Sequence, residues 1–172
     1  MRLDRVPAGT IVFIDANTFI YHFTGASPQC STFLSRCEAR QLEGVTGVHV
    51  LAEVAHRLMM IEAVRKGLVT PGGVAGKLRE HPEVVRSLTD YQISVDTILS
   101  AGIRIVALTP EDLSLSAVVR SNSGLLVNDS LTAAMIQRER IPALATSDSD
   151  FERMQRLRLY SPTDLPWPTP AQ

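Results

Sequence analysis

The sequence has few of the features that mark secreted or membrane-spanning proteins. Only two of its 172 residues are cysteine, and no apolar run reaches the roughly 20 residues that span a bilayer. The first ten residues, MRLDRVPAGT, lack the apolar segment of a signal peptide. Cys30 and Cys37 stand seven positions apart, a spacing that suits neither a disulfide framework nor a CxxC zinc site. We therefore expect free thiols, a cytoplasmic location and no membrane partner.

The overall charge of the chain also gives no general attraction to nucleic acid. The formal net charge is −1, and aromatic residues make up only 5% of the chain. A nucleic-acid partner would have to be held by local arginines or by a bound cation. So few aromatic residues do not predict a platform for stacking bases.

The composition is that of an ordinary globular domain, with 45% apolar and 20% charged residues. This length suits one domain with a sizeable core. We expect that domain to cover residues 1–161 and to include a helical stretch at about 66–100. A proline-rich tail, residues 162–172, follows and cannot be helical.

Short apolar segments alternate with helical patterns along the chain. The predicted strands are 10–14, 45–50, 103–108, 143–146 and 157–160. They are apolar without polar alternation, which is typical of a parallel sheet covered by helices on both faces. The stretch 66–100 is predicted to hold two or three helices, because apolar positions recur through it between turn signals. The fold class is therefore α/β.

Five acids are predicted at one edge of this sheet. Asp15 ends the first strand, and Asp148 and Asp150 follow the strand at 143–146. Glu53 falls in the first turn of the helix after the second strand, and Asp129 begins a later helix. Each acid alone can be a strand terminator, a helix cap or a turn residue. Ligands of open parallel sheets bind at the carboxyl ends of the strands, so the shared edge favours a site.

Clustered carboxylates need a neutralising charge. Several like charges held within a few ångströms are costly unless a cation offsets them. Mg²⁺ and Mn²⁺ prefer carboxylate oxygens and water, and they leave positions for phosphate. Such a site polarises a phosphoryl group and lowers the pKa of a bound water.

Three segments carry a resemblance to a known family: FIDANTFIYHF, LAEVAHRL and NDSLTAAMIQRERIPALATSDSDFERM. In this order and spacing they resemble the PIN-domain ribonucleases, most closely the VapC type of toxin–antitoxin systems. The resemblance implies a three-layer α/β/α sandwich around a central parallel sheet. It also implies Mg²⁺- or Mn²⁺-dependent cleavage of RNA, a homodimer and an antitoxin protein as partner.

The same resemblance implies a role for each matched residue. Asp15, Glu53 and Asp129 would hold the metal, and Asp148 would complete the cluster or position water. Asp150 would support the site or serve as an alternative ligand. Asn17 and Thr146 would hydrogen-bond the carboxylates or the substrate phosphate. The stretch 66–100 is longer than a compact toxin of this type needs, so an RNA-processing nuclease of the same fold stays open.

Three different functions fit these residues less well. Asp15-Ala16-Asn17 after a strand also resembles haloacid-dehalogenase-type phosphatases, but Asn17 replaces the second acid that their chemistry needs. Glu53-x-x-His56 has the spacing of a di-iron ligand pair, but no second pair is present. A catalytically idle domain that only binds RNA or protein would not need clustered, mutually repelling carboxylates.

The basic residues do not single out an RNA-binding surface. Most are expected on solvated helix faces, and some could line a groove for RNA phosphates. The sequence does not choose among Arg57, Arg65, Lys66, Arg138, Arg140, Arg153 and Arg156.

Overall fold

The computed structural model describes residues 1–165, and in that range five parallel strands form one sheet. The strand order is β3-β2-β1-β4-β5, with β1 in the middle. The strands are β1 (Ile11–Ile14), β2 (Glu43–Gly47), β3 (Arg104–Val106), β4 (Ala143–Ala145) and β5 (Arg158–Tyr160). Every neighbouring pair is parallel, which confirms the predicted parallel sheet.

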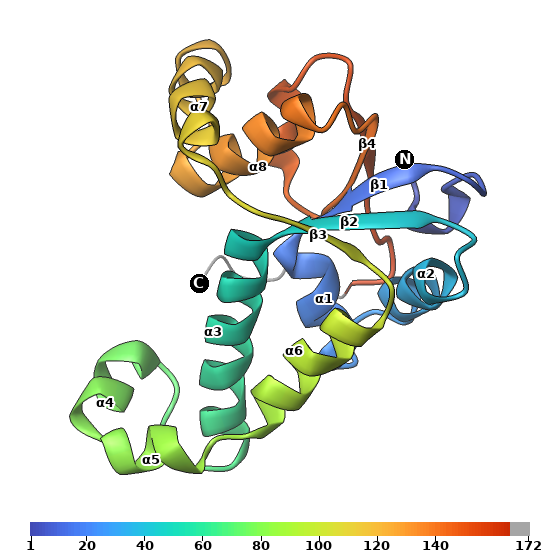
Figure 1. Cartoon of the computed structure of the whole chain (residues 1–172). Helices are drawn as coiled ribbons and strands as arrows, with labels where there is room; N and C mark the ends of the chain where they lie inside the picture. Colours follow the sequence, from blue (N-terminus) through green and yellow to red (C-terminus); the bar gives the residue numbers. More distant parts are fainter. Residues whose placement is uncertain (166–172) are drawn as a thin grey trace.

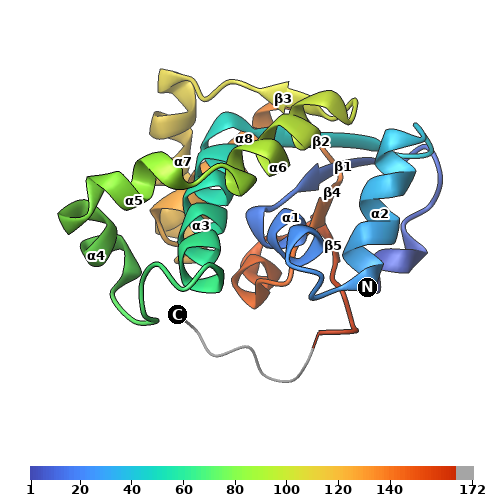
Figure 2. The ribbon, with the colours of Figure 1, turned by 90° about the horizontal axis from the view of Figure 1, so that it is seen from below.

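Helices cover both faces of the sheet (Figures 1 and 2). One face carries α1 (Ala16–Phe23), α2 (Pro28–Glu38), α3 (Val48–Arg65) and α6 (Asp90–Ser100). The other carries α7 (Pro110–Ser123) and α8 (Val127–Arg138). With both faces covered, Phe13 and Leu144 at the centre of the sheet are fully buried. The fold is the predicted three-layer α/β/α sandwich.

Two predicted boundaries differ from the structure. The second strand ends at Gly47, where its pairing with β3 ends, and α3 begins at Val48 rather than after residue 50. Glu53 therefore lies in the second turn of α3, not in the first as predicted. Similarly, α8 begins at Val127, so Asp129 is its third residue rather than its first. At the start of α3, the β-branched residues Val48 and Val50 adopt helical conformation because packing outweighs their modest strand preference.

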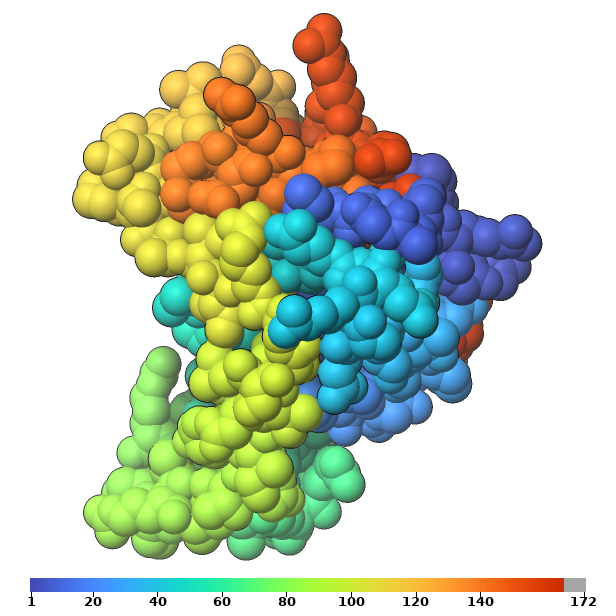
Figure 3. All heavy atoms as spheres, turned by 45° about the vertical axis from the view of Figure 1, so that its right-hand side comes forward, coloured from blue at the N-terminus to red at the C-terminus, as the bar shows by residue number. Residues whose placement is uncertain are grey.

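The stretch 66–100 forms three helices, in agreement with the prediction of two or three. They are α4 (Val74–Glu80), α5 (Pro82–Ser87) and α6. A second hydrophobic cluster, with Ala63, Leu78 and Leu88 at its centre, packs α4 and α5 against the end of α3. In Figure 3 the green segment of α4 and α5 forms one end of the molecule, opposite the orange segment of α8.

The order of the strands places a switch point beside β1. The chain passes from β1 through β2 to β3 on one side, and then returns to β4 and β5 on the other. In open parallel sheets, the crevice outside the carboxyl ends of the strands at such a point is where ligands bind. Ile14 and Ala145 are paired at these ends of β1 and β4, so the residues that follow them share the crevice.

The two ends of the described chain lie together. The Leu3 N–H donates to the carbonyl of Ser161 at 2.9 Å. Asp164 accepts hydrogen bonds from the Ser27 hydroxyl at 2.6 Å and from the Gln29 N–H at 2.8 Å, which fastens the chain end to the start of α2. Residues 166–172 of the predicted proline-rich tail lie outside the described residues.

Two further expectations can be compared with the described part of the chain. Cys30 and Cys37 are both buried on α2 and both free, as predicted. Burial raises the pKa of Cys30 to about 11 and that of Cys37 to about 12. None of the helices in residues 1–165 is long and apolar enough to span a membrane.

Candidate active site

Asp15 is held where β1 passes into α1. Its N–H donates to the carbonyl of Ala145 at 3.1 Å, which continues the β1–β4 pairing by one residue. Its Oδ1 accepts the N–H of Ala16 at 2.8 Å, so Asp15 caps α1. Its Oδ2 accepts the hydroxyl proton of Thr146 at 2.7 Å. The carboxylate is therefore fixed between the ends of the two strands.

The loop after β4 continues this chain of hydrogen bonds. The N–H of Asp148 donates to Oγ1 of Thr146 at 3.0 Å, and the N–H of Asp150 donates to Oδ1 of Asp148 at 2.8 Å. Asp148 thereby caps the short 3₁₀ helix η2 (Ser149–Arg153). Asp150 in turn pairs with Nη2 of Arg153 at 2.9 Å. Asp150 is the only one of the five predicted acids in an ion pair this short among residues 1–165.

Glu53 approaches from α3 together with an arginine. Nη1 of Arg57 donates to Oδ1 of Asn17 at 2.8 Å and lies 3.6 Å from Oε1 of Glu53. The arginine therefore bridges α1 and α3. No local pattern predicts the bond to Asn17, although Glu53 and Arg57 have the i, i+4 spacing of an ion pair on a helix.

Asp129 faces the same acids from α8. It is partly buried, and no hydrogen bond from another described residue offsets that burial. Burial, and then the negative charges of Asp148, Asp15, Glu53 and Asp150 in decreasing order, raise its pKa to about 6.

Burial and the neighbouring acids also affect the pKa of Asp15. Burial raises it most, while the hydrogen bonds from Thr146 and Ala16 lower it. The charges of Glu53 and Asp148 raise it further, and the result is a pKa of about 6. The structure therefore brings acids from four separate elements close enough for their charges to contribute to the raised pKa values of Asp15 and Asp129. We call Asp15, Glu53, Asp129 and Asp148 the acid cluster.

The donor set fits a hard divalent cation. Within residues 1–165, no three His, Cys, Asp or Glu side chains form, as they stand, a group that could hold a metal ion. The cluster nevertheless offers only carboxylate oxygens, the ligands that Mg²⁺ and Mn²⁺ prefer. A cation would also neutralise the repulsion among these carboxylates, which contributes to the raised pKa values of Asp15 and Asp129. Histidine, cysteine and their softer metals play no part in this set.

A fold of this topology, with carboxylates at its switch point, belongs to the class of α/β proteins that act on ligands at the carboxyl edge of a parallel sheet. Within that class, the family model of the PIN domain matches residues 12–157. The chain belongs to the PIN domain family. This confirms the predicted family and leaves no support for the phosphatase alternative.

Solved structures with the same fold include two VapBC-type proteins. VapBC2 from Rickettsia felis, bound to a DNA fragment from its promoter, is 17% identical with a TM-score of 0.58, covering 88% of this chain and 98% of that chain. VapC20 from Mycobacterium tuberculosis, a toxin that cleaves the sarcin–ricin loop, is 14% identical with a TM-score of 0.57, covering 84% and 95%.

A third structure is a toxin–antitoxin complex from Klebsiella pneumoniae. It is 18% identical with a TM-score of 0.51, covering 85% of this chain and 94% of that chain. No curated protein sequence matches the chain. At these identities the structural likeness concerns the fold.

Proposed function

We propose that this protein is a metal-dependent endoribonuclease. The observation that carries the proposal is the acid cluster, in which burial, together with the charges of the neighbouring carboxylates, raises the pKa of Asp15 and of Asp129 to about 6. Membership of the PIN domain family and the position of the cluster at the switch point support it. The substrate we propose is RNA, cut at a phosphodiester bond.

Mg²⁺ or Mn²⁺ is the cofactor we propose for the cluster. Asp15, Glu53, Asp129 and Asp148 would hold it, with Asp150 as an alternative ligand. When bound, such an ion supplies Lewis-acid activation of the phosphate and a water of lowered pKa. The protein itself orients the carboxylate of Asp15, because Thr146 and the Ala16 N–H each hydrogen-bond one of its two oxygens.

Substituting the two acids of raised pKa tests this function. Asp15→Asn and Asp129→Asn should abolish Mn²⁺-stimulated cleavage of RNA while the circular dichroism spectrum stays that of the parent. Asp96→Asn is the matched control, because Asp96 is exposed on α6 and its carboxylate accepts a hydrogen bond only from Gln92 among the described residues. Parental cleavage by both site variants would overturn the metal-site proposal. Parallel assays with phosphomonoesters separate nuclease from phosphatase activity.

We further propose that the nuclease is the toxin of a toxin–antitoxin pair and acts in the cytoplasm. The similar structures from VapBC and toxin–antitoxin systems support this role. Expression of the parent should arrest growth, and Asp129→Asn should relieve the arrest. An RNA-processing nuclease of the same fold would cleave RNA without arresting growth.

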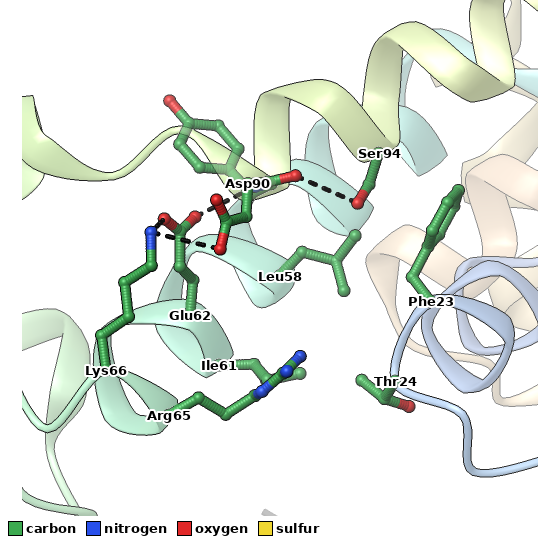
Figure 4. Close-up of a pocket in the computed structure, with 10 residues that line it drawn as sticks. Phe23, Thr24, Leu58, Ile61, Glu62, Arg65, Lys66, Asp90 and Ser94 are labelled. Atoms are coloured by element: carbon green, nitrogen blue, oxygen red, sulfur yellow. Dashed lines mark hydrogen bonds and ion pairs between the residues drawn. The ribbon is translucent and has the colours of Figure 1, made fainter.

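We propose that the antitoxin binds the surface between α1, α3 and α6. A hollow of about 260 Å³ opens there, and Figure 4 shows Glu62, Lys66 and Asp90 on one side of it and Phe23 on the other. Its apolar residues are Phe23, Leu58, Ile61 and Tyr91, and its charged residues are Glu62, Arg65, Lys66 and Asp90. Ile61→Glu should prevent copurification with the product of an adjacent reading frame without reducing RNA cleavage.

A homodimer is the second assembly we propose. Apolar side chains are exposed on α7 and at the start of α8, two helices that pack together: Leu113, Val118 and Val127 are each more than half exposed, and Leu126 is 72% exposed. Covering such side chains is favourable at roughly 25 cal/mol per Å². Leu126→Asp should convert the dimer to a monomer in light scattering.

A further inference from the structure

The acid cluster alone would repel the substrate that we propose for it. Four ionised carboxylates and one divalent cation leave a net negative site, and each RNA phosphate adds a further negative charge. The chain as a whole, with a net charge of −1, supplies no compensating attraction. A permanent positive charge beside the site would reduce this repulsion and favour the approach of a phosphate.

Two arginines touch the predicted acids among the described residues. Arg153 already uses both terminal nitrogens, with Nη1 donating to the carbonyl of Gly124 at 3.1 Å and Nη2 to Asp150 at 2.9 Å. Arg57 uses only Nη1, which donates to Asn17. Its Nε and Nη2 make no hydrogen bond to any residue in 1–165, and its side chain is 36% exposed. At the edge of the acid cluster, Arg57 can therefore donate further hydrogen bonds through Nε and Nη2.

The contacts of Arg57 also restrict the orientation of its guanidinium before the substrate binds. The 2.8 Å bond to Asn17 fixes one nitrogen, so less side-chain entropy is lost when the others bind. The 3.6 Å approach to Glu53 is loose, so Glu53 can turn to a cation without breaking a short hydrogen bond. A guanidinium presents paired donors that match two oxygens of a phosphate.

We propose that Arg57 binds a phosphate of the RNA strand at the acid cluster, and that Asn17 is the positioning residue that holds Arg57 in place. The proposal rests on the ribonuclease function proposed above and adds to it the group that recognises the substrate backbone. No bond is made or broken by Arg57, which stays protonated throughout.

RNA binding without cleavage tests the proposal. In the Asp129→Asn background, binding of a short fluorescein-labelled single-stranded RNA is followed by anisotropy over a range of salt concentrations. Adding Arg57→Gln should weaken binding about tenfold and lower the salt-dependence slope by about one. Arg57→Lys should keep the parental slope with weaker binding. Arg86→Gln, which removes an exposed arginine from α5, is the control and should change neither quantity.

A second measurement separates phosphate binding from a merely structural tie between α1 and α3. Mn²⁺ binding without RNA, measured by titration calorimetry, should be as tight in Arg57→Gln as in the parent. Parental RNA affinity and slope in Arg57→Gln overturn the proposal, and so does a loss of Mn²⁺ affinity in parallel with RNA affinity. Parental cleavage by both Asp15→Asn and Asp129→Asn would instead overturn the metal-site proposal, so the two failures are distinguishable.

Discussion

The hydroxyl of Thr146 donates a 2.7 Å hydrogen bond to Oδ2 of Asp15, although 131 positions separate the two residues. The bond joins the carboxyl ends of β1 and β4 at the point where the strand order reverses. Because Thr146 is fully buried, water cannot replace it as the donor. It is the main side-chain contact that opposes the rise in the pKa of Asp15.

Replacing Thr146 by valine removes the hydroxyl and keeps the shape of the side chain. Asp15 then loses its strongest pKa-lowering contact, so its pKa should rise above about 6. The pH profile of cleavage should move to higher pH, and activity near neutrality should fall about tenfold. Thr146→Ser keeps the donor and should keep the profile. An unchanged profile in Thr146→Val would show that the hydrogen bond does not control Asp15.

Cation binding should depend on pH through the same acids. Asp15 and Asp129, with pKa values of about 6, take up protons as the pH falls below that value, and a cation must displace those protons. Without metal, the native state binds more protons than the unfolded chain between pH 6 and about 4. Through these two groups, the free energy of unfolding of the metal-free protein therefore rises as the pH falls through that window.

The consequence is measurable by thermal unfolding with Mn²⁺ or with a chelator. Mn²⁺ should raise the unfolding temperature clearly at about pH 7.5 and little at about pH 5, because protons compete at the lower pH. Asp129→Asn should remove most of the increase. Equal shifts at both pH values would contradict the raised pKa values.

The sequence is sufficient to predict the sheet and the shared edge of the acids. The TIVFI segment is too short and too β-branched for a helix, and Asp15 directly follows it. Parallel strands put the residues after them at one edge, so the convergence of Asp15 and Asp148 follows from topology. The start of α3 is not predictable in this way, because its Val-His-Val sequence also suits a strand.

Tertiary pairings are harder to predict than elements. Arg138 lies on an exposed face, as expected, but its Nε also donates to Oδ1 of the buried Asp112 at 2.8 Å, a contact that the sequence does not predict. The bond between Arg57 and Asn17 joins residues 40 positions apart on different helices. Such contacts depend on how helices pack, which no local pattern of residue types specifies.

Breaking the pair of Asp112 and Arg138 should destabilise the layer formed by α7 and α8. Asp112 is fully buried and also accepts the backbone N–H of Thr109 at 2.8 Å. Asp112→Ala leaves these donors without an acceptor, so the free energy of unfolding should fall by about 3 kcal/mol. Urea unfolding measures this loss. Glu111→Gln, an exposed neighbour on α7, is the control, and an equal effect of both variants would count against the buried pair.

Glu62 should control how α6 is attached to α3. Its buried carboxylate accepts the N–H groups of Thr89 at 2.9 Å and Tyr91 at 3.0 Å, and Lys66 pairs with it (Figure 4). Burial by itself would raise the pKa of Glu62. The ammonium of Lys66 and the backbone N–H groups at the start of α6 outweigh burial and lower the pKa to about 2.

A lowered pKa makes this attachment sensitive to acid. The stabilisation from Glu62 is complete above the unfolded value of about 4.5 and is lost as the pH falls towards 2. Glu62→Gln should therefore reduce the free energy of unfolding by about 2 kcal/mol at neutral pH, and by less at about pH 3. Amide hydrogen exchange at the start of α6 should quicken in the same variant, whereas the exposed Glu80→Gln should leave it unchanged. If the difference between Glu62→Gln and the parent were the same at both pH values, the charge of Glu62 would not be what holds α6.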